Sequence, residues 1–364
     1  MACSSGWWGG EGIEPQAAAA RSLGFVTATE EVTQVGLADT YGRIATDLRV
    51  SLTDRCNLRC TYCMPEEGLD WLAKPELLTD DEIVRLVGIA VTQLGVHEIR
   101  FTGGEPLLRR GLVGIVARTT ALEPRPEVSL TTNGIGLARQ AVALKEAGLD
   151  RVNVSLDTIR PDTFVELTRR DRLKDVLAGM AAAQEAGLSP VKVNAVLMRG
   201  INDTHAPELL EFCLEHGYEL RFIEQMPLDA QHGWDRATMV TADEILERLG
   251  EQFGLEPTDA AARGSAPAEI FSVRGGAQTV GIIASVTRPF CGDCDRVRLT
   301  ADGQVRDCLF ARTESDLRSA MRAGADDAEL ADRWRRAMWK KLPGHGINDP
   351  SFLQPARPMS AIGG

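Results

Sequence analysis

Four segments of this chain repeat one local pattern: a helix ends, a glycine follows, and a short turn leads into an apolar strand. The repeats are Gln93–Phe101, Glu146–Val154, Glu185–Val193 and Glu215–Phe222, each with a glycine at its third position. A glycine there is typical of the left-handed residue that ends a helix. Apolar stretches at Leu48–Leu52 and Glu127–Thr131 bring the predicted strands to six. Because strands alternate with helices, the sequence favours parallel pairing with right-handed crossovers.

Six such units make three-quarters of a TIM-type barrel, so the sequence predicts an α/β fold with an incomplete (βα)6 barrel. Thr79-Asp-Asp-Glu82 has the pattern of a helix capping box, and Pro161 suits the first turn of another helix. Barrels of this type carry their chemistry at the C-terminal ends of the strands. The candidates at those ends are the loop that begins at Cys56, then Thr102–Glu105, Thr131–Gly134, Ser155, Asp157 and Met226.

Three cysteines follow the first predicted strand in the string Cys56-Asn-Leu-Arg-Cys60-Thr-Tyr-Cys63. A [4Fe–4S] cluster offers four irons, and thiolates are their usual ligands. Three thiolates would leave one iron open for a ligand that the protein does not supply. The alternatives are a zinc knuckle or an accidental cysteine cluster, but zinc modules favour paired C-x2-C units with four ligands. The spacing therefore favours an open iron–sulfur cluster.

A second set of three cysteines lies near the other end of the chain, at Cys291, Cys294 and Cys308. Alone, this set favours zinc, for example a ribbon completed by a distant histidine. Beside the first set, a second open cluster is the better interpretation. Arg296 and Arg298 alternate on a short predicted strand and so point to one face. Guanidinium groups match phosphate oxygens, so the pair suits a phosphate; the alternative is a solvated edge strand.

Composition narrows the class of protein further. The formal net charge of -12 argues against nonspecific nucleic-acid binding, so local arginines have to meet any polyanionic nucleotide. No run of 18 apolar residues predicts a membrane span, and the N-terminus lacks the pattern of a secretory signal. Six of the eight cysteines stand in the two sets and Cys213 lies in a core pattern, which indicates a reducing compartment and a cytoplasmic protein.

Three regions are predicted along the chain. Residues 1–40, rich in glycine and alanine, form a mobile extension, and residues 41–228 form the partial barrel. Residues 229–364 form a C-terminal unit that carries the second cysteine set and closes the barrel mouth.

Several of these motifs together resemble a known enzyme family. The first cysteine loop and the segment Phe101-Thr-Gly-Gly-Glu-Pro106 are similar to signatures of the radical SAM enzymes. In that segment two consecutive glycines let backbone approach a ligand closely. With the second cysteine set, the Arg-x-Arg pair and the final Gly363-Gly364, the chain resembles the GTP 3′,8-cyclases from about Tyr41 to Gly364.

The resemblance implies an activity and a set of cofactors. The reaction is the conversion of GTP to 3′,8-cyclo-7,8-dihydro-GTP, a lyase reaction and the first step of molybdenum cofactor biosynthesis. The implied cofactors are two [4Fe–4S] clusters and S-adenosylmethionine (SAM). SAM is cleaved at the first cluster to a 5′-deoxyadenosyl radical, which abstracts hydrogen from C3′ of the ribose.

The resemblance also assigns residues, one by one. The implied ligands of the two clusters are Cys56, Cys60 and Cys63, and Cys291, Cys294 and Cys308. The implied SAM contacts are Tyr62, Gly104, Ser155 and Met226, and the implied GTP contacts are Arg49, Arg100, Thr131, Lys192, Arg296 and Arg298. Gly363 and Gly364 are expected to reach into the barrel and organise the reacting geometry. Glu98 departs from the family, where a basic residue is common. It is expected to share a strand face with Arg100 and either to weaken that phosphate contact or to pair with Arg100, which puts that corner of the GTP site in doubt.

The expected partners follow from the same resemblance. They are GTP, an electron donor of flavodoxin or ferredoxin type, and a downstream cyclic pyranopterin monophosphate synthase, with no nucleic acid and no membrane. A homodimer is left open. One alternative function is a radical SAM peptide-modifying maturase with an auxiliary cluster, although such enzymes usually carry more cysteines. Another is an iron–sulfur redox carrier or sensor, which needs neither the Gly-Gly-Glu-Pro segment nor a barrel.

Overall fold

The computed structural model describes residues 36–259 and 263–363, which belong to one compact unit. Its main sheet in this part of the chain has twelve strands in the order β14-β13-β12-β3-β4-β5-β6-β7-β8-β11-β10-β9. The central strands are β3 (Asp47–Ser51), β4 (Glu98–Thr102), β5 (Glu127–Thr132), β6 (Arg151–Ser155), β7 (Val191–Val196) and β8 (Glu219–Ile223). The flanking strands are β9 (Leu255–Pro257), β10 (Glu269–Val273), β11 (Thr279–Ile283), β12 (Arg296–Leu299), β13 (Gln304–Arg306) and β14 (Ser315–Asp316).

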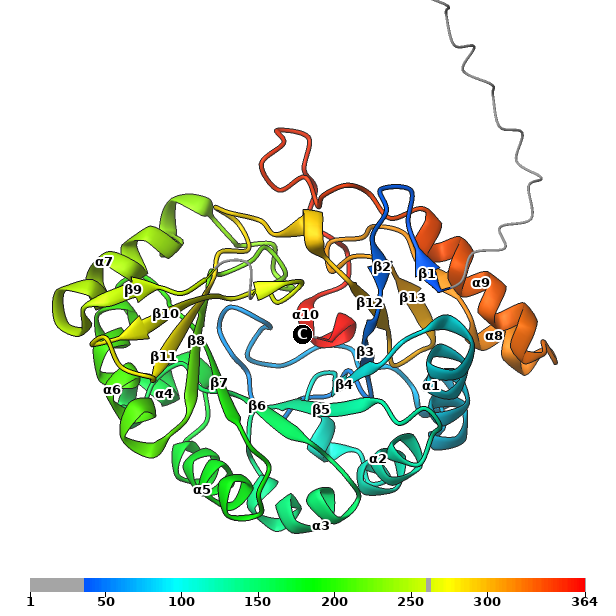
Figure 1. Ribbon diagram of the computed structural model, residues 1–364, viewed down its shortest axis with the longest axis horizontal. Coiled ribbons are helices and arrows are strands. Elements are labelled where there is room, and N and C mark those ends of the chain that lie inside the picture. The colour runs from blue at the N-terminus through cyan, green and yellow to red at the C-terminus, as the bar shows by residue number, and fades with distance from the viewer. Residues whose placement is uncertain (1–35, 260–262, 364) are drawn as a thin grey trace, which may run out of the picture. The chain divides into compact units, whose positions relative to one another are not determined.

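Helices cover the outer face of the curved sheet (Figure 1). The α-helices are α1 (Asp80–Leu94), α2 (Leu112–Thr120), α3 (Ala141–Glu146), α4 (Pro161–Thr168), α5 (Leu173–Glu185), α6 (Ala206–His216), α7 (Ala242–Phe253), α8 (Arg318–Arg322), α9 (Asp327–Trp339) and α10 (Met359–Ile362). Short 3-10 turns stand at Lys74–Glu76, Pro106–Leu108, Leu137–Arg139, Asp203–His205, Arg236–Thr238 and Cys291–Asp293. In the described part of the chain, no helix has the length and apolar character needed to cross a bilayer.

The six predicted strands are β3 to β8, and every neighbouring pair among them is parallel. The predicted capping box is also confirmed: Glu82 N–H donates to Thr79 Oγ1 at 3.2 Å, and Thr79 N–H donates to Glu82 Oε2 at 2.7 Å. Pro161 is the first residue of α4. The glycines of the four repeats all have positive φ, between 71° and 93°. The incomplete TIM-type barrel is therefore the observed fold.

Two further strands extend the barrel beyond this prediction. β12 pairs in parallel with β3, and β11 pairs in parallel with β8, so the C-terminal region supplies a strand to each edge of the six-stranded sheet. The sequence predicted a unit that closes the barrel mouth, but not that it would continue the barrel sheet itself.

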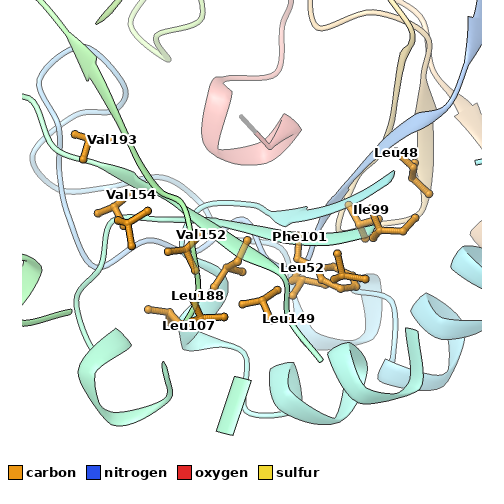
Figure 2. Packing of buried hydrophobic residues seen from close by; sticks show 14 of the residues in the cluster. Leu48, Leu52, Ile99, Phe101, Leu107, Leu149, Val152, Val154, Leu188 and Val193 are labelled. Carbon is orange, nitrogen blue, oxygen red and sulfur yellow. The ribbon is translucent and has the colours of Figure 1, made fainter. Parts of the chain in front are cut away.

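The main hydrophobic core lies between the sheet and the helices. Alternate strand residues such as Leu48, Ile99 and Phe101 are fully buried in it, because their side chains point outward to the helices (Figure 2). A second cluster joins Leu228, Met239, Val286, Phe310, Ile347 and Ile362 in the C-terminal region. Because Ile362 belongs to α10, the second core anchors this short helix inside the ring of strands (Figure 1).

The N-terminal part of the folded unit begins earlier than predicted. Within the expected extension of residues 1–40, Leu37 is fully buried and β1 (Leu37–Ala38) pairs with β2 (Ile44–Ala45). Arg43, between these strands, donates hydrogen bonds to the carbonyls of Cys291 at 2.6 Å and Leu342 at 2.6 Å. Residues 36–45 thus brace the second cysteine loop. Residues 1–35, including Cys3, lie outside the described residues, and the boundary at residue 228 stays a prediction.

Candidate active site

The first cavity lies beside the C-terminal ends of the barrel strands, and all three cysteines of the first set line it. Cys56, Cys60 and Cys63 belong to the loop that follows β3. Other lining residues include Tyr62, Gly103, Gly104, Thr131, Asn133, Ser155, Asp157, Met359 and Ser360. The structure therefore gathers the first cysteine set and three of the four predicted SAM contacts around one space. The fourth, Met226, lines the second cavity instead.

The two glycines after β4 are required by close backbone packing. A Cβ on Gly103 would lie 2.4 Å from the carbonyl oxygen of Thr53, and one on Gly104 would lie 2.3 Å from that of Arg55. Gly104 N–H also donates to Thr53 O at 2.7 Å. The sequence predicted close approach to a ligand; the structure adds close approach to the chain's own segment ahead of Cys56. Any side chain there would push the cysteine loop away from the cavity.

Glu105 connects this segment to the next strand. It is fully buried and accepts hydrogen bonds from Thr132 Oγ1 at 2.7 Å and from Asn133 N–H at 2.7 Å. Burial raises the pKa of Glu105 to about 7 despite these donors. The side-chain amide nitrogen of Asn133 in turn lies 3.8 Å from the sulfur of Cys56. Glu105 thus supports the cysteine loop through Asn133.

The thiols of the first set lie in a setting that disfavours free thiolates. Burial raises the pKa of Cys56 to about 11 and that of Cys63 to about 12, and it raises the pKa of Cys60 well above its ordinary value. Tyr62 donates a 2.6 Å hydrogen bond to Asp157, whose pKa burial raises to about 6. Iron ligation requires thiolates, so binding of a cluster to these cysteines must release protons.

The second cavity is lined by all three cysteines of the second set together with both arginines of the Arg-x-Arg pair. The lining residues are Met226, Ser285, Phe290, Cys291, Cys294, Arg296, Arg298, Cys308, Leu309, Phe310 and His345. Cys294 differs from the other cysteines. Burial acts to raise its pKa, but the positive charges of Arg296 and Lys341 outweigh burial and lower it to about 7. This side of the second set is already arranged for a thiolate.

A row of arginines runs across neighbouring strands on the inner face of the barrel. Arg298 of β12 is the register partner of Arg49 on β3, and Arg49 is the partner of Arg100 on β4. All three were predicted GTP contacts. Thr131, Asn153 and Lys192 form a second row across β5, β6 and β7. The strand register thus explains why contacts far apart in sequence face one interior.

This interior holds more positive charge than it neutralises. Asp47 lies 3.5 Å from Arg49 and 3.9 Å from Arg100. Burial, with neighbouring arginines adding to it, lowers the pKa of Arg49, of Arg298 and of Arg100, the last to about 9. Buried charge requires compensation, because removing an ion from water costs several kcal/mol. A polyanion bound beside this row would supply it.

Unpaired polar atoms occur in the same interior. Arg49 Nε, Asn153 Oδ1, Asn194 Oδ1 and Arg296 Nε are buried without a hydrogen-bond partner. Buried polar atoms in folded proteins nearly always have a partner. Donors and acceptors left open on the inner strand faces fit a ligand that carries both kinds of group, as a nucleotide does.

The C-terminal segment enters the barrel, as predicted for Gly363. Arg298 Nη1 donates a 2.5 Å hydrogen bond to the carbonyl of Gly363. Gly363 has a φ of 88°, and a Cβ there would lie 2.8 Å from Thr102 Cγ2 and 3.2 Å from Ser51 Cβ. Met359 and Ser360 of the same segment line the first cavity. The segment therefore lies between the first cavity and the arginine row; Gly364 is outside the described residues.

Glu98 pairs with a different residue from the one that the sequence suggested. Its Oε2 lies 3.8 Å from Arg151 Nη2, and Arg151 Nε donates to Glu127 at 2.7 Å. Burial, then the charges of Asp47 and Glu127, raise the pKa of Glu98. Asp47, Glu98 and Glu127 are register partners across β3, β4 and β5. The prediction that Glu98 shares a strand face with Arg100 fits this register, but its ion pair is with Arg151.

Sequence reasoning missed several residues of the inner face, among them Asp47, Arg151, Asn153, Asn194 and Arg221. A signal for them exists. Buried parallel strands usually read as continuous apolar runs. In β6, β7 and β8 polar residues instead alternate with apolar ones. That alternation marks a barrel interior lined by polar groups.

The two cysteine sets fit the clusters that their spacing suggests. Each set lines one cavity, and the first has space beside it for a cofactor bounded by Tyr62, Gly104 and Ser155. Within residues 36–259 and 263–363, no three histidine, cysteine, aspartate or glutamate side chains converge to hold a single metal ion. The fit therefore rests on the shared cavities and on the donors around the sulfurs.

Comparison with known sequences shows which protein families this chain is similar to. The sequence profile of the Radical SAM superfamily matches residues 50–213, and that described as Molybdenum Cofactor Synthesis C matches residues 218–347. A protein of Streptomyces coelicolor named GTP 3′,8-cyclase is 72% identical over 328 residues, which cover 90% of this chain and 96% of that protein. One of Mycobacterium tuberculosis named GTP 3′,8-cyclase 2 is 61% identical over 332 residues, covering 90% of this chain and 92% of that protein.

Solved structures share the fold at low identity. Streptococcus suis SuiB bound to precursor peptide SuiA has a TM-score of 0.60 at 16% identity, covering 88% of this chain and 76% of SuiB. Native anSMEcpe with bound AdoMet has a TM-score of 0.55 at 16% identity, covering 83% and 82% of the two chains.

Proposed function

The chain belongs to the GTP 3′,8-cyclase family of the radical SAM superfamily, and from this premise we propose that it converts GTP to 3′,8-cyclo-7,8-dihydro-GTP, the first step of molybdenum cofactor biosynthesis. One observation carries the proposal beyond family membership. A row of arginines, of which Arg298 is buried and Arg49 and Arg100 are partly buried, faces the barrel interior. Arg298 lines the second cysteine cavity and also contacts the C-terminal segment that lines the first. Neither a peptide-modifying maturase nor a redox carrier would explain this row of arginines or the high identity to proteins named GTP 3′,8-cyclase.

The cofactors have defined holders in this proposal. Cys56, Cys60 and Cys63 hold the first [4Fe–4S] cluster, with Tyr62, Gly104, Ser155 and Met226 around SAM. Cys291, Cys294 and Cys308 hold the second cluster, next to the guanine. When bound, the first cluster and SAM supply the one-electron chemistry that removes hydrogen from ribose C3′, because cofactors carry the radical steps and proteins orient them.

The chain's own residues position the nucleotide. Arg49, Arg100 and Lys192 meet the triphosphate, and the paired guanidinium groups of Arg296 and Arg298 also suit its phosphate oxygens. Thr131 supplies a hydroxyl to the sugar side. Charge-assisted hydrogen bonds from guanidinium groups fix phosphate oxygens in direction as well as distance. C3′ and C8 belong to the same nucleotide, so holding GTP in one conformation with C3′ near the first cavity and C8 within reach of C3′ favours ring closure over other reactions.

The function is tested by anaerobic turnover with dithionite, SAM and GTP, followed by mass spectrometry of the nucleotide. We expect a product with the mass of GTP, a changed fragmentation pattern and one 5′-deoxyadenosine per turnover. SAM cleavage should depend on GTP. Cleavage that is indifferent to GTP, with only unchanged GTP recovered, would rule the proposed reaction out.

Replacing both Arg296 and Arg298 with alanine is expected to weaken GTP binding strongly. Each removes a charge-assisted hydrogen bond worth ~1.5–3 kcal/mol, so each single change costs roughly ten- to a hundredfold in Kd. Binding is measured by calorimetry on the anaerobic protein, and SAM affinity should barely change. Arg274→Ala is the matched control, because Arg274 is exposed and pairs with Glu211. Unaltered GTP affinity in the double variant would mean that Arg296 and Arg298 have a structural role and do not bind the nucleotide.

Replacing Glu98 with glutamine is expected to tighten GTP binding. The change removes a partly buried negative charge from the arginine-rich interior and leaves Arg151 paired with Glu127. Removing about 1 kcal/mol of repulsion corresponds to roughly fivefold in Kd. Glu251→Gln, at an exposed position of α7, is the control and should leave Kd unchanged. Weaker binding in the Glu98 variant would mean that this carboxylate helps to hold the nucleotide.

The partners remain part of the proposal. The reaction needs a low-potential one-electron donor, of flavodoxin or ferredoxin type, and its cyclised product needs a cyclic pyranopterin monophosphate synthase. Reduction of the purified protein by each donor class, followed spectroscopically, distinguishes the two types.

A further inference from the structure

A lysine is buried beside the second cysteine set. Lys341 follows α9 and is only 3% exposed. Its ammonium group donates to the carbonyl of Cys294 at 3.1 Å, to the carbonyl of Arg296 at 3.0 Å and to the sulfur of Cys294 at 3.4 Å. A lysine has three N–H donors, so all three are used. None of these acceptors is a carboxylate.

Such a placement is costly unless a negative charge lies close by. The two carbonyls carry no net charge to balance an ammonium ion removed from water, for which the penalty is several kcal/mol. Asp307 is near enough for the charge of Lys341 to act on it, but burial raises the pKa of this carboxyl, and within the described residues it forms no ion pair with Lys341. A cluster bound by three thiolates carries net negative charge, and one of those thiolates is the acceptor already in contact. The reduction potential of an iron–sulfur cluster depends on net charge, hydrogen bonds to sulfur and burial.

We propose that Lys341 is the positioning residue and counter-ion of the second cluster: it holds the Cys294 thiolate, raises the reduction potential of the cluster, and fixes the segment from Cys294 to Arg296. The same ammonium contacts a cluster ligand and the backbone of a predicted GTP contact. It therefore couples the geometry of the second cluster to that of the nucleotide site. This inference rests on the proposed second cluster.

The adjacent residue provides a matched control. Lys340 carries the same side chain one position earlier but is exposed. Lys341→Met keeps the length and apolar stem of the side chain and removes only the charge and the donors, and Lys340→Met makes the same change in solvent. Lys341→Arg restores the charge, and Lys341→Gln restores donors without charge.

The test is a redox titration of the full-length holoprotein, followed by EPR, with iron quantified in each variant. The measurement is repeated in a Cys60→Ser background to isolate the second signal. In Lys341→Met we expect the midpoint potential of the second cluster to become more negative, because a nearby positive charge favours the reduced form. Lys340→Met should match the unsubstituted protein, and Lys341→Arg should lie closer to it than Lys341→Gln.

The outcomes separate the inference from its premise. Iron for a single cluster in the unsubstituted protein overturns the proposed second cluster itself. Two clusters with an unshifted potential in Lys341→Met overturn the role of Lys341 alone. If Lys341→Met does not assemble the second cluster, the other two variants at this position distinguish the outcomes. Assembly in Lys341→Arg but not in Lys341→Gln supports the counter-ion role, and failure of both variants to assemble it overturns that role.

Discussion

Changing Cys60 to serine is expected to abolish SAM cleavage while leaving the second cluster assembled. A serine hydroxyl does not replace a thiolate as an iron ligand. Only two cysteine ligands then remain in the first cavity, which are too few to hold a [4Fe–4S] cluster with a single open iron. The second set lines a separate cavity, so its assembly does not depend on Cys60. Anaerobic iron and sulfide analysis, with chromatographic detection of 5′-deoxyadenosine, measures both effects.

Changing Cys294 to serine is expected to give the reverse result: some uncoupled SAM cleavage and no cyclised nucleotide. The first cavity stays intact, but the site next to the guanine is lost. Cys213→Ala is the control, because Cys213 is fully buried in α6 and belongs to neither set. Loss of both clusters in either single variant, or stoichiometric zinc bound at the second set, would contradict the assignment of two independent clusters.

Deleting Gly363 and Gly364 is expected to stop formation of the cyclised product while leaving both clusters, the melting temperature and GTP binding nearly intact. Gly363 lies against Thr102 and Ser51 and accepts from Arg298, so its removal frees the guanidinium and opens the space between the cavities. Reacting groups displaced by about 1 Å lose roughly a hundredfold in rate. A peptide ending in Ser-Ala-Ile-Gly-Gly, added in trans, should restore part of the activity. Product analysis after single turnover is the measurement.

A point substitution tests the same segment more gently. Gly363→Ala places a methyl group 2.8 Å from Thr102 Cγ2 at a φ of 88°, so the segment must shift. Gly346→Ala is the control: Gly346 also has positive φ, 69°, but nothing lies within 4 Å of its added Cβ. Both substitutions place an L side chain at positive φ, but only Gly363→Ala also brings it against neighbouring atoms, so only the first should lose product. Full turnover by Gly363→Ala would mean that the position of the C-terminal segment does not affect the reaction.

The barrel could be predicted because its signals are local. Each helix end, glycine and strand lies within nine residues, and the cysteine spacings are equally short. The inner rows could be predicted only in part. Arg49, Arg100 and Lys192 were predicted from the family resemblance. Arg151 and Arg221 lie on strands in which polar and apolar residues alternate, but this alternation identified them as inner-face residues only once the strand register was known.

Lys341 shows what a sequence cannot supply. It stands in Trp339-Lys-Lys341 at the end of a helix with an exposed tryptophan, a context typical of solvated lysines. Its burial depends on the approach of Cys294 and Arg296, more than forty positions earlier in the chain. The short strand at Arg296–Leu299 was predicted, but its parallel pairing with β3 was not, and neither was the pairing of β11 with β8, since both pairings join distant parts of the chain.

Those two strands have a consequence for how the protein can be divided. β3 and β8 are the outer members of the six-stranded barrel sheet, and each is covered by a strand from beyond residue 278. An uncovered strand edge offers free N–H and C=O groups to any other chain, which leads to aggregation. A fragment ending near residue 228 would expose both edges at once and self-associate. The region that carries the second cysteine set therefore also covers the strand edges at which the barrel would otherwise self-associate.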